Sequence, residues 1–180
     1  MRVFIGTVFV LLLGVGVSFA ASELKNENLL VTMPDGYKVA YSDRKKGLVV
    51  SEMIPKAQSL EDWQDMVTVQ VHFSVHPTMS ALVKQFTKVG NPICEDYSGF
   101  LVRKGRENGY EFGLFLTSCS ITPASKSEKV LTKAILGKDS TYFVIKSWRS
   151  GLDEADIVKW SGYMAGVKVC DSRIADSACP

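Results

Sequence analysis

Hydrophobic and polar residues alternate without a break over residues 67–75, where every second side chain from Val67 to Val75 is apolar. This period of two predicts a β-strand with one buried face. The same analysis predicts further strands at residues 28–32, 37–42, 48–54, 93–104, 109–121, 128–136 and 141–148. Short polar turns join most of these segments, so consecutive strands should be antiparallel.

A helical pattern follows the alternating strand. Apolar side chains recur at the spacing of one helix face, at Met79, Leu82, Val83 and Phe86. Pro77 suits the first turn of this helix, and the Gly-Asn-Pro sequence at residues 90–92 should end it.

A second helix is predicted near the end of the chain. Asp153 suits its N-cap, and Leu152 and Ile157 are spaced for a hydrophobic staple. Its apolar stripe is formed by Ile157, Trp160, Met164 and Val167. A much shorter helical turn is predicted after Ser59, just before Trp63. Together these elements predict an α+β domain: a twisted antiparallel sheet of about six or seven strands, flanked by helices.

The first twenty residues predict the compartment. Arg2 precedes an apolar run of about 15 residues, which is shorter than the roughly 20 needed to span a membrane. Ser18 and Ala20 are the small residues that a signal peptidase requires. We therefore interpret residues 1–20 as a cleaved signal peptide, residues 21–170 as a single domain and residues 171–180 as a C-terminal tail. This predicts a periplasmic or secreted protein with no membrane span in its mature chain.

Four cysteines, an even number, indicate disulfides in such a compartment. A hairpin turning at residues 105–108 would place Cys94 directly opposite Cys119 on the neighbouring strand, close enough for a bridge. Cys170 then pairs with Cys179 and ties back the tail. No Cys-x-x-Cys spacing supports the alternative of bound metal.

Charge and motifs restrict the possible functions. The net charge is only +2, and no clustered basic face indicates a nucleic-acid partner. On a strand, His72 and His76 would be about 13 Å apart, too far to share a metal ion. No Gly-x-Ser-x-Gly sequence indicates a nucleophile. We therefore predict no catalytic residue, no metal site and no cofactor.

A possible binding surface remains, formed by Trp63, Trp148 and Arg149. Trp63 lies where the chain leaves a polar loop, so it either pins that loop to the core or lines an apolar groove. Lys146 and the basic turn at residues 44–46 are most simply explained as solvated positions, with a weak surface for an anionic partner as the alternative.

The order of the predicted elements resembles the Mog1/PsbP-like fold, and the resemblance covers most of residues 28–170. Residues 53–70, in which Pro55 precedes a polar link, Trp63, the triplet Met-Val-Thr and Gln70, resemble a stretch of uncharacterised secreted bacterial proteins. Members of the broader fold serve as accessory factors and binding modules more than as enzymes. The resemblance transfers no functional site.

These expectations favour a non-catalytic binding or accessory module of the cell envelope, with an unidentified protein partner. A small-ligand carrier is the alternative and would have an enclosed pocket with converging polar groups. A cell-envelope hydrolase would instead need titratable groups clustered in a cleft. The oligomeric state is left open.

Overall fold

The computed structural model describes residues 24–88, 94–120 and 127–180. The predicted signal peptide at residues 1–20 lies outside the described residues, as do the predicted helix stop at residues 90–92 and most of the loop that follows Cys119. The strands are β1 (Glu27–Leu30), β2 (Tyr37–Lys45), β3 (Leu48–Pro55), β4 (Asp65–Phe73), β5 (Asp96–Glu107), β6 (Tyr110–Ser120), β7 (Glu128–Leu136), β8 (Ser140–Trp148) and β9 (Lys168–Asp171). The helices are α1 (Met79–Thr87), α2 (Glu154–Gly166) and a short 3-10 turn, η1 (Ala175–Ser177).

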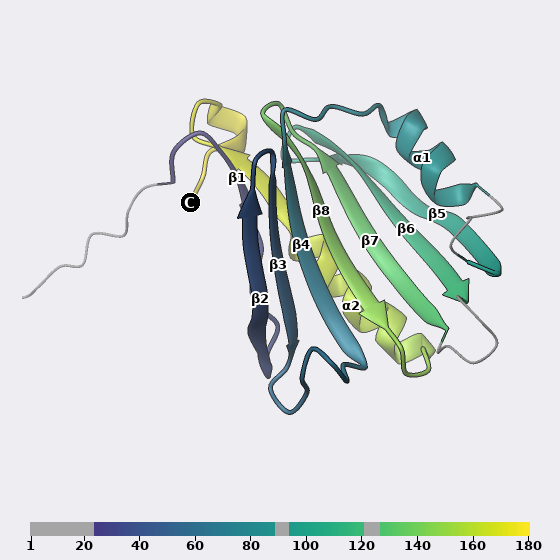
Figure 1. Ribbon diagram of the computed structural model, residues 1–180. Coiled ribbons are helices and arrows are strands. Elements are labelled where there is room, and N and C mark those ends of the chain that lie inside the picture. Colours follow the sequence, from purple (N-terminus) through teal and green to yellow (C-terminus); the bar gives the residue numbers. More distant parts are fainter. Residues whose placement is uncertain (1–23, 89–93, 121–126) are drawn as a thin grey trace, which may run out of the picture.

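Seven strands form one antiparallel sheet in the order β2-β3-β4-β8-β7-β6-β5, so β2 and β5 are its outer strands (Figure 1). The predicted fold class, α+β with a twisted antiparallel sheet flanked by helices, is confirmed. The strand predicted at residues 28–32 corresponds to β1, which lies outside the main sheet because it pairs with β9 in a separate two-stranded sheet. β9 was not predicted.

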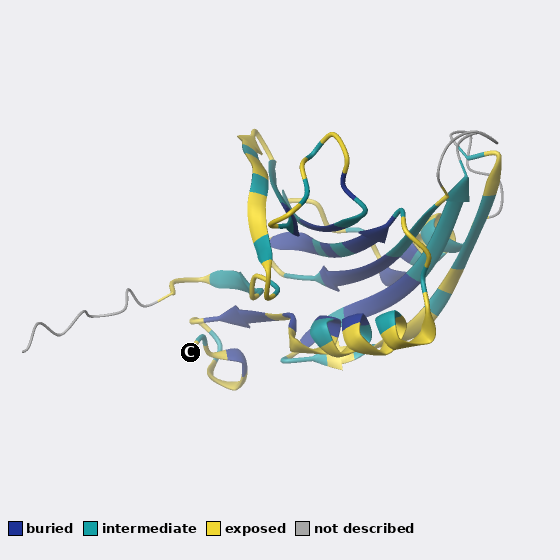
Figure 2. Ribbon diagram, turned by 90° about the horizontal axis from the view of Figure 1, so that it is seen from below, coloured by how far each residue is buried: buried dark blue, intermediate teal, exposed yellow. Residues whose placement is uncertain are grey.

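The two helices cover opposite faces of the main sheet. On one face, Trp160 and Met164 of α2 pack against apolar residues of the central strands, including Leu114. On the other face, Met79 and Leu82 of α1 pack on Phe115, the next residue of β6. Successive strand residues point to opposite faces, so both helices can bury apolar surface on one sheet. Buried residues accordingly fill the central strands, whereas exposed ones follow the outer strands and the outer side of α2 (Figure 2).

The β5–β6 hairpin differs from the expected register. Its turn is Asn108-Gly109, whose φ angles of 51° and 81° suit the two-residue turn that this dipeptide favours. Cys119 therefore faces Tyr97, not Cys94. The predicted Cys94–Cys119 disulfide nevertheless forms, with a Cα–Cα distance of 5.4 Å, because Cys94 lies just before β5 begins. The disulfide prediction is confirmed, but the register from which it was inferred is wrong.

Of the three predicted helix starts, the structure confirms some and contradicts others. Asp153 caps α2 through a 2.8 Å hydrogen bond from the Asp156 amide, as predicted. Thr78 caps α1 by accepting a hydrogen bond from the amide of Ala81, so Pro77 lies before the helix and not in its first turn as predicted. The helical turn predicted after Ser59 is wrong, because residues 56–64 form an irregular loop between β3 and β4.

Candidate functional site

The residues of the predicted binding surface do not form one patch. The guanidinium carbon of Arg149 lies 3.7 Å from the centroid of the Trp63 ring, so these two side chains stack. Trp63 itself is buried and packs with Ile54 and Met66, which pins the 56–64 loop. Trp148 is only 1% exposed and belongs to the core under α2. Its side chain therefore presents no surface to a partner in this arrangement.

Lys146 is buried, which corrects its assignment to a solvated basic spot. Its ammonium is 2.6 Å from the Asp65 carboxylate and lies among the rings of Tyr37, Trp148 and Trp160, at 5.9, 5.0 and 4.5 Å from their centroids. Burial lowers the pKa of Lys146, and Asp65 opposes that shift. The alternation along β8 carried a signal for this position, because Lys146 is in phase with the core residues Val144 and Trp148.

A second buried lysine, Lys133, caps the end of α2. Its ammonium donates to the carbonyl oxygens of Met164 and Val167 at 2.9 and 2.8 Å, and to the Glu107 carboxylate at 2.5 Å. A cation at this position complements the negative end of the helix dipole. Burial lowers the pKa of Lys133, while Glu107 acts in the opposite direction. All three ammonium protons have acceptors, so this lysine is engaged by its own chain.

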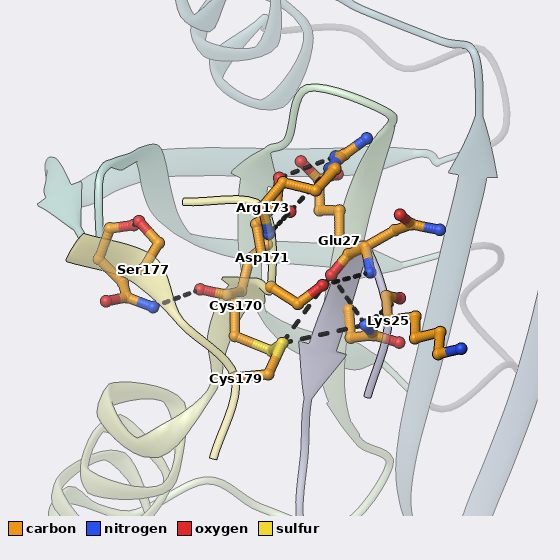
Figure 3. The surroundings of a disulfide bond; sticks show 12 residues. Lys25, Glu27, Cys170, Asp171, Arg173, Ser177 and Cys179 are labelled. Atoms are coloured by element: carbon orange, nitrogen blue, oxygen red, sulfur yellow. Dashed lines mark hydrogen bonds and ion pairs between the residues drawn. A yellow bond between two sulfur atoms is a disulfide. The ribbon is translucent and has the colours of Figure 1, made fainter. Parts of the chain in front are cut away.

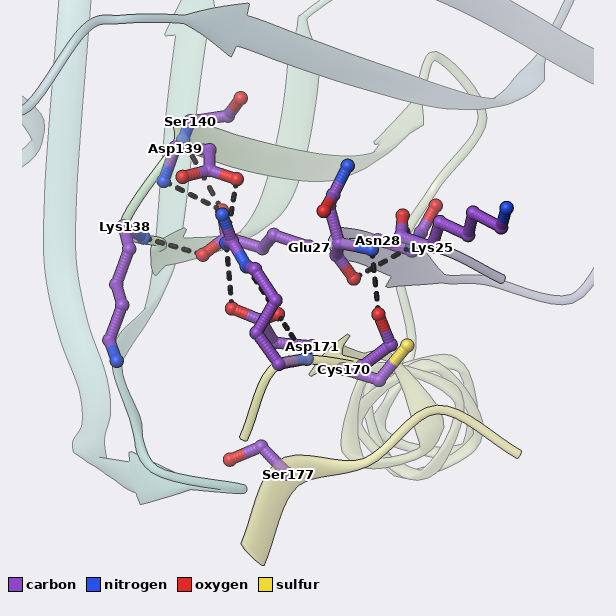
Figure 4. A network of polar contacts seen from close by, with 12 residues as sticks. Lys25, Glu27, Asn28, Lys138, Asp139, Ser140, Cys170, Asp171 and Ser177 are labelled. Carbon is purple, nitrogen blue, oxygen red and sulfur yellow. Dashed lines mark hydrogen bonds and ion pairs between the residues drawn. The ribbon is translucent and has the colours of Figure 1, made fainter. Parts of the chain in front are cut away.

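Glu27 and its partners form a polar network at the turn between β7 and β8 (Figure 4). The Glu27 carboxylate accepts hydrogen bonds from the amides of Lys138, Asp139 and Ser140 at 2.6, 3.1 and 3.3 Å, and from the Tyr142 hydroxyl at 2.9 Å. Burial, followed by the hydrogen bond to Glu27 and then the charge of Glu27, raises the pKa of Tyr142. The carboxylate thus joins β1 to the β7–β8 turn.

The C-terminal tail is fixed beside this network. Arg173 donates to the buried Asp171 carboxylate through Nε and Nη2, both at 2.8 Å, and its Nη2 also donates to Asp139. The hydrogen bonds from Arg173 lower the pKa of Asp171 to about 2. The predicted Cys170–Cys179 disulfide is confirmed and closes the tail onto β9 (Figure 3). These polar groups attach β1 and the C-terminal tail to the β7–β8 turn.

An apolar groove lies between β5–β6 and the first turn of α2. Its volume is about 220 Å³, and it is lined by Ser98, Phe100, Leu116, Thr117, Ser118, Lys129, Leu152 and Ile157. Phe100 is 63% exposed at its rim, and Ile157 is 37% exposed although it belongs to the predicted core stripe of α2. Val102 and Val158 are further large apolar side chains that are exposed on the same two elements. Exposed apolar side chains beside a groove, such as Phe100 and Ile157, are typical of contact surfaces.

The strand that carries Phe100 is firmly held. The C-terminal turn of α1 packs so closely on Gly99 that a Cβ there would be 1.9 Å from the Phe86 carbonyl oxygen. The hydroxyl of Tyr97 donates to the same oxygen at 2.7 Å. The Cys94–Cys119 disulfide fixes the chain just before β5. Phe100 is therefore presented on a rigid template.

The histidines are not brought together with other metal ligands. His72 lies in β4, where its Nε2 donates to the side-chain oxygen of Gln70 at 3.0 Å, while His76 follows the strand. Burial lowers the pKa of His72. In the part of the chain that the structure describes, no three His, Cys, Asp or Glu side chains lie close enough to share a metal ion. None of the helices in that part is long and apolar enough to cross a bilayer.

Comparison with protein-family models and with curated proteins found no match to the sequence. Among solved structures, the fold is similar to the solution structure of cyanobacterial PsbP (CyanoP) from Synechocystis sp. PCC 6803. The TM-score is 0.45 and the sequence identity 12%, and the alignment covers 87% of this chain and 99% of that chain. We draw no functional inference from a similarity at this level. The resemblance to secreted bacterial proteins remains a prediction.

Proposed function

We propose that this protein is a non-catalytic binding module of the cell envelope, periplasmic or secreted, that acts through protein–protein contact at the groove between β5–β6 and α2. The observation that carries the proposal is the exposure of Phe100 and Ile157 around a groove on a rigid strand. An aromatic side chain at the rim of an apolar groove is the kind of anchor that dominates protein interfaces.

The charged clusters support a binding role over a catalytic one. Lys146 is paired with Asp65, Lys133 with Glu107 and two carbonyl oxygens, and Asp171 with Arg173. These side chains are held by contacts within the chain, so their perturbed pKa values are explained by structural roles. The groove has one charged lining residue, Lys129. A hydrolase needs several titratable groups that converge on its substrate, and a single lysine does not supply them.

The two disulfides support the proposed compartment. Disulfides form and persist in oxidising environments such as the periplasm and the extracellular space. One of them anchors the strand that presents Phe100, and the other secures the C-terminal tail. The proposed contact surface and the proposed location therefore depend on the same oxidised state.

Native mass spectrometry of the protein purified gently from producing cells tests this function. We expect an assembly that contains at least one further protein chain, and we expect Phe100→Glu to abolish it. The matched control is Val39→Glu, because Val39 is similarly exposed on the other outer strand, β2. Near-ultraviolet circular dichroism checks that both variants fold. A reproducible small-molecule adduct on a single chain would instead identify a ligand carrier and contradict the proposal.

A further inference from the structure

The outer edge of β5 is divided into two parts with different chemistry. After Arg103 the strand carries the further positive charges of Lys104 and Arg106, and a β-bulge at Val102 interrupts its register. Bulges and edge charges are the usual protection against pairing with another strand. Residues 97–102, by contrast, carry no charge and include the exposed Phe100. This half of the edge remains able to accept a further strand.

We propose that the partner at this edge is a second copy of the same chain, which pairs antiparallel through β5 about a two-fold axis at Gly99. This inference rests on the proposed function, because it names the protein that fills the groove. Such an interface is self-complementary, since each residue contact occurs twice.

The sequence of β5 fits this pairing on both sides of the axis. With Gly99 opposite its own counterpart, Ser98 of one copy faces Phe100 of the other. Ser98 and Phe100 point to the same face of the sheet, because they pair with Ser118 and Leu116 of β6. Ser98 lines the groove, so Phe100 of the second copy is brought to the groove formed with Leu152 and Ile157.

The charges at the two ends of this segment are also complementary. Because Val102 is the extra residue of the bulge, the next ladder position after Leu101 is Arg103, and it falls opposite Asp96 of the second copy. Both side chains point to the α2 face, since Asp96 is in phase with Ser98 and Arg103 lies over the Phe112 ring of that face at 5.7 Å. Both residues are exposed in the single chain. The two-fold axis produces this acid–base pair twice.

The axis also coincides with the point where α1 packs closely on the strand. The packing of Gly99 against the Phe86 carbonyl holds the backbone in place before pairing. A strand that is ordered before association loses less conformational entropy on binding. The other outer strand, β2, carries Lys38, Asp43, Arg44 and Lys45 along its nine residues and provides the comparison edge.

Sedimentation velocity of the purified oxidised protein over a range of concentrations tests the pairing. We expect a monomer–dimer equilibrium in which Asp96→Arg and Arg103→Asp each weaken the dimer at least about tenfold. Combining the two substitutions should restore it, because the charges are exchanged and not removed. Lys38→Glu on β2 serves as the control and should leave the equilibrium unchanged. A monomer at every concentration, or a double variant as weak as either single one, would overturn the inference.

Cysteine cross-linking gives an independent measurement of the register. All four native cysteines are in disulfides, so an introduced thiol has no native competitor. A mixture of Ser98→Cys and Phe100→Cys proteins should form a disulfide-linked heterodimer, whereas a Tyr41→Cys protein should form none with either. If the chain is monomeric and Phe100 instead contacts a different protein in cells, the proposed function stands and the second-copy inference fails.

Discussion

The ammonium of Lys146 lies 2.6 Å from the carboxylate of Asp65, although the lysine side chain is completely buried. Asp65 is the first residue of β4 and Lys146 is near the end of β8, two strands that are neighbours in the sheet. Three aromatic rings from β2, β8 and α2 surround the ammonium. The pair therefore holds the sheet and α2 together at one end of the molecule.

Removing the charge of Asp65 should lower the stability of the protein much more than replacing Lys146 with an uncharged residue. Asp65→Asn leaves a buried ammonium without its counter-ion, and we expect a loss of about 3 kcal/mol in the free energy of unfolding. Lys146→Met keeps the apolar contacts and leaves Asp65, which is partly exposed, able to reach water, so its cost should be below about 1 kcal/mol. Urea denaturation measures both. Equal losses for the two variants would contradict a structural role for the ion pair.

Two glycine substitutions should have opposite effects. Gly99→Ala places a Cβ 1.9 Å from the Phe86 carbonyl oxygen, so α1 or β5 must shift and stability should fall. Gly162→Ala meets no atom within 4 Å in the middle of α2 and should increase stability by about 0.5–1 kcal/mol. Thermal denaturation of the two variants beside the wild type checks this pair. A Gly99→Ala protein as stable as the wild type would show that α1 does not pack closely on β5.

Acid should weaken the attachment of the C-terminal tail within a defined pH window. The pKa of Asp171 is about 2 in the folded chain, below its ordinary value of 3.8. Between these values the unfolded chain binds more protons than the folded chain, so the stabilisation is complete above about pH 4 and is lost as the pH falls towards 2. Arg173→Gln removes the main cause of the shift and should flatten this part of the stability profile. Parallel slopes for wild type and variant from pH 4 to 2 would contradict the assignment.

The two disulfides should contribute unequally to stability. The Cys94–Cys119 bridge closes a sequence separation of 25 residues and the Cys170–Cys179 bridge one of 9. Chain entropy gives about 3.5 kcal/mol for the first and about 2.5 kcal/mol for the second. Replacing each pair with alanines and measuring urea midpoints checks the order. A larger loss for the Cys170–Cys179 pair would show that tail contacts, not loop closure, dominate.

The sequence predicted the sheet and both long helices because their apolar periods are long and regular. The sequence-based prediction was wrong for two local features: the register of the β5–β6 hairpin and the helical turn after Ser59. In the β5–β6 hairpin, alternation alone fits several registers, and only the Asn108-Gly109 dipeptide indicates the correct one. The short helix after Ser59 was predicted from cap residues, but three or four residues cannot form a stable helix without further turns.

The candidate groove could not be predicted in the same way. Phe100 and Ile157 are far apart in the sequence, and each has an ordinary structural explanation in its own segment: strand alternation for Phe100 and the helix stripe for Ile157. They meet only because α2 crosses the sheet so that its first turn lies beside β5–β6. By contrast, the burial of Lys146 could be predicted from the alternation along β8, because Lys146 points to the same side of the strand as two core residues. A charged residue at such a position is expected to be buried and paired with an opposite charge.

Photo-cross-linking in producing cells is the most direct test of the groove as a protein-contact surface. A photoreactive amino acid at position 157 faces the groove, and one at position 39 reports on the opposite outer strand. We expect a discrete protein adduct from position 157 and none from position 39. An adduct from position 39 alone, or none from position 157 in a folded protein, would contradict the account.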